Sequence, residues 1–185
     1  AGTRYSDSTP RILGQLRSRF GTIAAVGDHD IFTNKPMVLK ALGRMGIRVI
    51  EDSTIFLNVD ACRIALSVVT YTYPQRPTQA RLEKVSAEGQ GDYRILLVHQ
   101  PAESIVEFAR DKGYRLALAG HTHGGGIAFG IPGVFLMAPA SLENKFVSGL
   151  YHVGQLDLSV TNGLGLTLAP VRFQAPAEIV LITLR

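Results

Sequence analysis

Histidines follow three of the strands that the sequence predicts. The four imidazoles come directly after the apolar runs 22–26, 95–98 and 116–119: His29, His99, His121 and His123. The carboxyl ends of strands are where α/β sheets place their ligand sites. If the three strands are neighbours in one sheet, these imidazoles converge. Three strand ends that each carry histidine favour a built site over unrelated polar residues.

The residue types favour a metal ion as the ligand. Imidazole together with carboxylate suits divalent zinc, iron or manganese. Asp28 supplies an anionic ligand beside His29, and Asp30 is placed to orient the His29 ring. Glycines flank the segment from His121 to His123, so its backbone can approach an ion closely. With Cys62 as the one cysteine, neither a disulfide framework nor a cysteine-ligated zinc site can form.

Each of these residues also has an ordinary structural interpretation. A single histidine at a strand end is most often a hydrogen-bonded structural residue. Asp28 and Asp30 taken alone would serve as turn residues or as the N-cap of the next helix. The joint occurrence of all of them favours a site. His152 has no such company, and we interpret it as structural.

Strands and helices that can position these residues occur along the whole chain. Residues 94–119 have the pattern of a β–α–β unit, with an amphipathic helix at 102–112 between two buried runs. Mixed strands and helices in both halves predict an α/β architecture. The other expected helices are 9–20, 35–45 and 78–87, and the other expected strands are 22–26, 48–50, 54–59, 63–69, 155–160, 165–168 and 179–184.

Length and composition bound the possible functions. At 185 residues the chain is about one domain long. Its 46% hydrophobic and 18% charged residues exclude a disordered chain, and no apolar run approaches the ~18 residues of a transmembrane segment. The formal charge is +4, but the basic residues are scattered, which argues against a dedicated nucleic-acid surface. A mild positive field suits an anionic substrate such as a phosphate ester.

Three motifs resemble the later motifs of calcineurin-like metallophosphoesterases. They are Val26–Asp30, Leu97–Pro101 and Ala119–Gly125. The C-terminal stretches Asn162–Gly165, Pro170–Phe173 and Pro176–Ile179 resemble a bacterial branch of that family. The resemblance runs from about Thr22 to the end of the chain.

The resemblance implies a fold and an activity. The family fold is an α/β/β/α sandwich, in which two mixed β-sheets pack face to face and helices flank them. The family hydrolyses phosphate monoesters or diesters at a dinuclear centre, so the resemblance implies two divalent ions of manganese, iron or zinc.

It also implies a role for each matching residue. Asp28, where the family usually has asparagine, would bind one ion together with His99 and His121. His123 would reach the other ion. His29 would contact the substrate phosphate and help the leaving group depart, and Asp30 would steady His29.

The chain departs from the family at its start. An Asp-x-His motif and a Gly-Asp-x-x-Asp motif normally supply the ligands of the first ion and the bridging carboxylate. Neither precedes Gly27, and Asp7 is the one acidic residue before it. We therefore expect residues 1–185 to form a single partial domain that lacks N-terminal strands and holds at most one ion well. Alone it should be inactive, with an open sheet edge that pairs with an N-terminal fragment or another copy.

A second interpretation needs no missing partner. The chain would then be a degenerate or truncated phosphoesterase-like domain that acts as a non-catalytic binding or assembly module. Ligands for the first ion would be absent because no such ion is needed. An upstream segment with the two absent motifs would favour the enzyme over this alternative.

Overall fold

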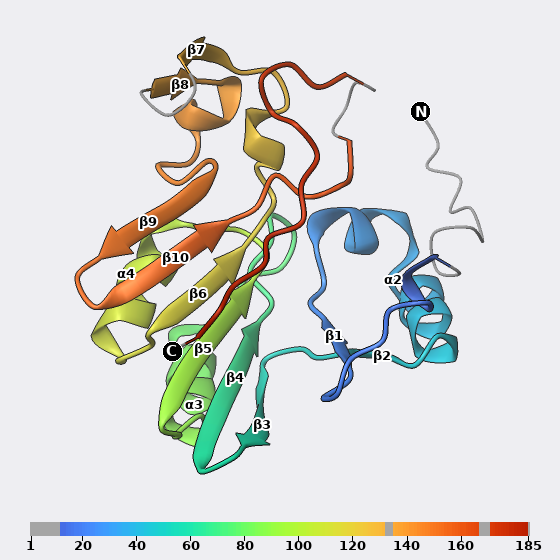
Figure 1. Cartoon of the computed structure of the whole chain (residues 1–185), viewed down its shortest axis with the longest axis vertical. Coiled ribbons are helices and arrows are strands. Elements are labelled where there is room, and N and C mark those ends of the chain that lie inside the picture. The colour runs from blue at the N-terminus through green and yellow to red at the C-terminus, as the bar shows by residue number, and fades with distance from the viewer. Residues whose placement is uncertain (1–11, 132–134, 167–170, 185) are drawn as a thin grey trace.

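A six-stranded mixed sheet forms the centre of the computed structural model, which describes residues 12–131, 135–166 and 171–184 (Figure 1). Its strand order is β3-β4-β5-β6-β10-β9. The strands are β3 (Ser53–Val59), β4 (Cys62–Val69), β5 (Tyr93–Val98), β6 (Leu116–Ala119), β10 (Leu156–Val160) and β9 (Gly149–Val153).

The inner four strands are parallel, and the two edge strands are antiparallel to their neighbours. Parallel strands are covered on both faces, which is why β4, β5 and β6 read as nearly continuous apolar runs. Each edge strand joins its neighbour through a tight hairpin. Asp60 and Gly154 have positive φ angles of 53° and 65° there, as such turns require.

Two helices cover one face of this sheet, behind it in Figure 1: α3 (Gln79–Glu88) and α4 (Glu103–Asp111). The Thr78 hydroxyl caps α3 by accepting a hydrogen bond from the Arg81 N–H. The larger hydrophobic core lies between these helices and the sheet, with Val85, Ile105 and Leu96 at its centre.

A second, two-stranded sheet covers part of the other face. It pairs β1 (Thr22–Ala24) with β2 (Ile47–Val49) in parallel, and α2 (Asp28–Arg44) connects and flanks them. Ile23 packs against Leu66 and Val68 of β4 in a smaller core. The layers are therefore helix, sheet, sheet, helix, as predicted, with a second sheet of only two strands among the described residues.

The C-terminal segment crosses the same face over β6 and β10, along the front of the sheet in Figure 1. A strand was predicted over residues 179–184, and that prediction is wrong, since the described backbone there forms no ladder. The segment pairs with no strand of the described chain, so its nearly continuous apolar run stays outside any sheet. Ile179 and Leu181 are 83% and 93% exposed.

Several other boundaries differ from the predictions. The helix expected over 9–20 has only residues 12 and 13 helical among its described part, and its Thr9-Pro10 start lies outside the described residues. A strand was expected at 165–168. Residues 165 and 166 belong to no strand, and residues 167 and 168 lie outside the described chain.

Other elements were extended or missed. The helix predicted from Lys35 begins at Asp28, with non-helical angles at Asn34 just before Pro36. Strand β9 was not predicted, nor were β7 (Phe129–Ile131), β8 (Phe135–Met137) and the 3₁₀ helices η1 (His123–Gly125) and η2 (Pro139–Leu142). None of the helices in the described part of the chain is both long enough and apolar enough to cross a membrane.

Candidate metal centre

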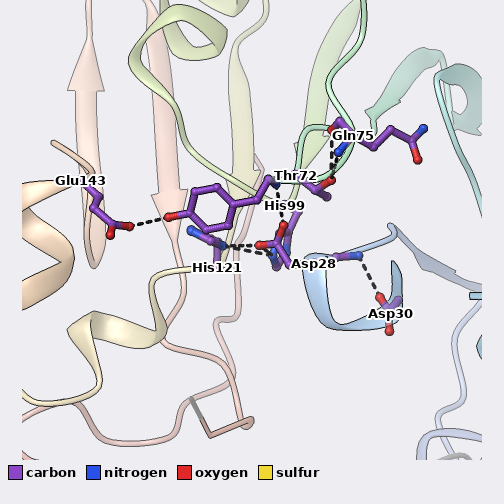
Figure 2. A network of polar contacts seen from close by, with 9 residues as sticks. Asp28, Asp30, Thr72, Gln75, His99, His121 and Glu143 are labelled. Carbon is purple, nitrogen blue, oxygen red and sulfur yellow. Dashed lines mark hydrogen bonds and ion pairs between the residues drawn. The ribbon is translucent and has the colours of Figure 1, made fainter. Parts of the chain in front are cut away.

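Three predicted ligands meet at one edge of the main sheet, as Figure 2 shows. The Asp28 Oδ2 atom lies 2.8 Å from His121 Nδ1 and 3.0 Å from His99 Nε2. The two imidazole nitrogens are 3.2 Å apart. Within the described residues these side chains form the group suited to hold a metal ion.

Two of the three ligands are brought together by strand pairing. β5 and β6 are parallel neighbours, with Leu97 opposite Leu118, so the residues that follow them leave the sheet at the same edge. His99 and His121 are those residues. The condition that all three strands be neighbours in one sheet is met by β5 and β6 but not by β1, which belongs to the two-stranded sheet. Asp28 reaches the site from that second layer, at the first residue of α2.

The spacing of the three atoms fits an ion. Ligand atoms held ~2.1 Å from a tetrahedral zinc ion are about 3.4 Å from one another. The observed separations of 2.8–3.2 Å are slightly shorter, which suits a set that hydrogen-bonds without an ion and opens a little to admit one. One carboxylate and two imidazoles are a donor set for zinc, iron or manganese.

The backbone around the ligands is shaped to let them approach. A Cβ atom on Gly27 would lie 2.9 Å from the His99 ring, so a larger residue there would push that ring away. His121 and His123 have φ angles of 71° and 52°, in the left-handed region that residues with side chains rarely adopt. Such angles cluster at functional sites, where the surrounding structure holds them.

Asp28 is oriented by a residue that the sequence did not indicate. The carboxylate is buried, and its Oδ1 atom accepts a 2.7 Å hydrogen bond from the Tyr73 N–H, which leaves Oδ2 to face the imidazoles. The Tyr73 ring also packs edge-on against His121, with centroids 5.0 Å apart. Because the bond to Asp28 comes from the backbone, the side-chain types in this loop carried no signal of it.

Tyr73 is itself held by Glu143, a second residue that the sequence did not single out. The phenol donates a hydrogen bond to the Glu143 carboxylate, which follows η2 (Figure 2). This bond, with burial, raises the pKa of Tyr73 to about 12. The phenol therefore stays protonated at neutral pH and closes one side of the site as a neutral group.

The electrostatics of the site keep the half-buried His99 in the form that binds metal. Burial lowers the pKa of His99, and the neighbouring Asp28 carboxylate opposes that shift only in part. The neutral imidazole has a free nitrogen lone pair, which is the ligand form. His99 is therefore neutral at physiological pH.

The remaining predicted residues lie around the same cavity. His29 is exposed in the first turn of α2, and it lines the cavity together with His123 and the three ligands. Burial lowers the pKa of His123, whose Nδ1 atom lies 3.3 Å from the carbonyl of Gly165. The Asp30 carboxylate accepts a 2.8 Å hydrogen bond from the Gly27 N–H at the start of α2.

His152 lies away from this cavity. Its imidazole contacts the Asp157 carboxylate at 2.6 Å in an exposed pair that joins β9 to β10. That pairing agrees with the structural interpretation of His152.

The amino-acid sequence of the chain is similar to those of several curated metallophosphoesterases. The chain is 29% identical over 177 residues to the uncharacterized metallophosphoesterase YkuE of Bacillus subtilis, covering 94% of the chain and 59% of YkuE. It is 30% identical to the uncharacterized metallophosphoesterase Cj0846 of Campylobacter jejuni, covering 94% and 44%. A Bos taurus transmembrane protein with a metallophosphoesterase domain is 29% identical, covering 94% and 40%. The chain thus spans about half the length of these relatives.

Comparison with solved structures supports the fold. A candidate 5'-nucleotidase from Staphylococcus aureus, solved with α-ketoglutarate, superposes with a TM-score of 0.61 at 10% identity, covering 86% of this chain and 35% of that one. No protein-family model matches the chain. The curated relatives are nevertheless named metallophosphoesterases. Their matches cover about 94% of this chain, which includes all the predicted site residues. Over about 94% of its length, then, the chain is a homologue of proteins named metallophosphoesterases, which agrees with the resemblance of its motifs to the calcineurin-like family.

Proposed function

We propose that residues 1–185 are a single partial domain of a metal-dependent phosphoesterase. The observation that carries the proposal is the convergence of Asp28, His99 and His121 on one point, in a chain whose relatives are named metallophosphoesterases. The ligands come from two layers and from distant parts of the sequence, so chance proximity of surface groups does not explain them.

In this proposal the triad holds one divalent ion and His123 contacts the second ion of a dinuclear pair. Such ions act as Lewis acids toward the phosphoryl oxygens of a monoester or diester. Asp28 contributes the negative charge of the site, and Tyr73 fixes which carboxylate oxygen is presented. Neutral His99 binds without first losing a proton.

His29 has a different role in the proposal. Its imidazole lines the cavity but is not among the three ligand atoms that cluster. Histidine is the side chain most often used as a general acid or base near neutral pH. We assign it to the substrate phosphate and to protonation of the leaving-group oxygen, with Asp30 steadying the helix turn that carries it.

The proposal also extends to partners. Within the described residues one compact ligand group is present, and residues 1–27 contain no histidine and one acid, Asp7. We propose that the chain alone holds at most one ion well and has little activity. Its ligands for the first ion would come from an N-terminal segment that also pairs with the edge of β1 that has no strand partner among the described residues.

Metal content tests the centre directly. We expect the purified chain, loaded with manganese or zinc and then desalted without chelator, to retain about one ion per molecule. The triple variant Asp28→Ala, His99→Ala, His121→Ala should retain none, whereas the control His152→Ala should match the unmodified chain. Circular dichroism shows whether each variant is folded. Equal metal content in the folded triple variant and the unmodified chain would refute the proposed centre.

A further inference from the structure

Arg172 lies at the junction of three loops, one of which carries His123 of the candidate metal centre. Its guanidinium donates to five backbone carbonyls and to no carboxylate among the described residues. The carbonyls come from segments far apart in sequence: His123, Asn162, Gly163, Gly165 and Ala175. Nη1 contacts two of the carbonyls and Nη2 contacts three, so the hydrogens of Nη2 are shared, while Nε has no partner among the described residues. The rigid planar fork of the guanidinium lets one side chain reach all of these segments.

Two of these carbonyls are directly linked to the site. Arg172 Nη1 donates to the His123 carbonyl at 3.3 Å, and Nη2 donates to the Gly165 carbonyl. That same Gly165 carbonyl is the 3.3 Å partner of the His123 imidazole Nδ1. Arg172 therefore contacts the backbone of His123 and also the group that orients its ring.

The loop that Arg172 holds needs an external support. His123 and the glycines 124, 125 and 126 all have positive φ angles, between 52° and 87°. The loop's own backbone hydrogen bonds are short-range, such as those from the Gly125 N–H to Thr122 and from the Gly126 N–H to His123, so other segments fix its position in the fold. The neighbouring residue Phe173 supplies further support, because its N–H donates to the Gly126 carbonyl and its carbonyl accepts from Ala128.

A second group secures the far side of the same junction. The Asn162 side chain accepts from the Ser148 hydroxyl and donates to the Pro176 carbonyl. A Cβ atom on Gly124 would lie 2.3 Å from the Asn162 amide oxygen, so the loop packs directly on this side chain. The loop around His123 is therefore held from both sides.

Since a carbonyl can only accept, the contact with Gly165 requires the proton of neutral His123 to be on Nδ1. Its Nε2 atom then carries the free lone pair. We propose that Arg172 is a positioning residue, which fixes the Gly165 carbonyl and thereby holds His123 in the Nδ1–H tautomer with Nε2 available to an ion or a phosphate. The role of Nε2 toward an ion or a phosphate rests on the proposed function, whereas the tautomer follows from the contact with Gly165 alone.

The test is a long-range ¹H–¹⁵N spectrum of the histidine rings in the metal-free chain, with His123 assigned by its loss in His123→Asn. We expect the unmodified chain to show His123 as one Nδ1–H tautomer. In Arg172→Lys, a point charge that cannot reach all five carbonyls, the two ring nitrogens should shift toward each other as the tautomers mix. The His99 and His121 signals should change little.

A matched control separates this effect from loss of any buried arginine. Arg94 also donates hydrogen bonds to backbone carbonyls, those of Ser86 and Lys112. Its guanidinium stacks over the ring of Tyr114, away from the candidate metal centre. Arg94→Lys should lower stability without changing the His123 tautomer. If Arg172→Lys leaves His123 unchanged, or if both variants change it equally, the proposal is wrong.

Folding and metal binding are measured on the same samples. If Arg172→Lys and Arg172→Gln both fail to fold while Arg94→Lys folds, Arg172 is a general folding residue and the proposal is overturned. Manganese binding at the triad should be equal in the unmodified chain and in folded Arg172→Lys. Absence of metal binding in the unmodified chain would refute the proposed function and leave the tautomer result to be judged by itself.

Discussion

Most of the polar side chains in the cavity are fixed by contacts with one another, whereas the His29 imidazole is exposed to solvent. Asp28, His99 and His121 contact one another closely, and Tyr73 is fixed by Glu143. His29 is exposed at the cavity, and its ring has no hydrogen bond or ion pair to the other described residues. A solvent-accessible imidazole is suited to proton transfer, whereas ligands need a fixed geometry.

Replacement of His29 tests this division. In an active preparation of the protein we expect His29→Ala to lower turnover by ~10²–10⁴-fold, the usual range for loss of a general acid. Metal content should not change, because the ligand atoms are on other residues. Steady-state kinetics with an aryl phosphate, with elemental analysis of the same samples, make the measurement. Loss of metal together with activity would show instead that His29 is a ligand.

At the level of elements, the start of α2 and the ends of β5 and β6 form the site together. Gly27 precedes the helix and lies against the His99 ring, so the helix can approach the strand end closely. The first ligand is thereby delivered by a helix start and the other two by strand ends. The spacing of the three ligand atoms therefore depends on how closely the start of α2 approaches the end of β5.

A pair of glycine substitutions in and beside α2 tests the approach. In Gly27→Ala the new methyl group would overlap His99, so we expect metal affinity at the triad to fall by ~10–100-fold, as for other residues that position ligands. Gly43→Ala is the control, since its Cβ would meet nothing within 4 Å. It should keep the affinity and gain ~0.5–1 kcal/mol of stability. Equal affinity in both variants, measured by titration with manganese, would contradict this account.

The elements also show which features could be predicted from sequence. His99 and His121 were found because each follows an apolar run, and parallel neighbours end at the same edge. The position of Asp28 in a second layer was not predictable, because strand order is set by pairing partners outside the motif. Tyr73 gave no signal, since its backbone is what binds Asp28. The strand predicted at 179–184 has the right pattern but no neighbour among the described residues to pair with.

Across the whole molecule, the two faces of the main sheet differ in how well they are covered. The face under α3 and α4 is fully buried at Leu96, Val98 and Ala117. On the opposite face Ile95, Leu97 and Leu118 are only partly buried, between the two-stranded sheet and the C-terminal segment. Open backbone edges next to partly exposed apolar side chains favour pairing with another chain.

Light scattering on the purified chain tests this feature. We expect a mass above the 20.0 kDa of a monomer, because the extended segment 179–184 can pair with a second copy. Lysine at the exposed positions, in Ile179→Lys with Leu181→Lys, should shift the chain toward monomer. Aryl-phosphate and aryl-diester assays with added manganese should detect little activity in either sample. A stable and active monomer of the unmodified chain would contradict both expectations.

The carboxylate at position 28 has a consequence for which side chains the site can accept. Both of its oxygens are acceptors at once, one toward the Tyr73 N–H and the other toward the imidazole pair. An asparagine, the usual family residue, has a single acceptor oxygen. With that oxygen toward the imidazoles and the ion they would hold, its amide N–H groups would face the Tyr73 N–H, donor against donor. Restoring the family residue would therefore require the backbone at Tyr73 to turn away. The aspartate and the loop that carries Tyr73 form a matched pair, and each limits how the other can change.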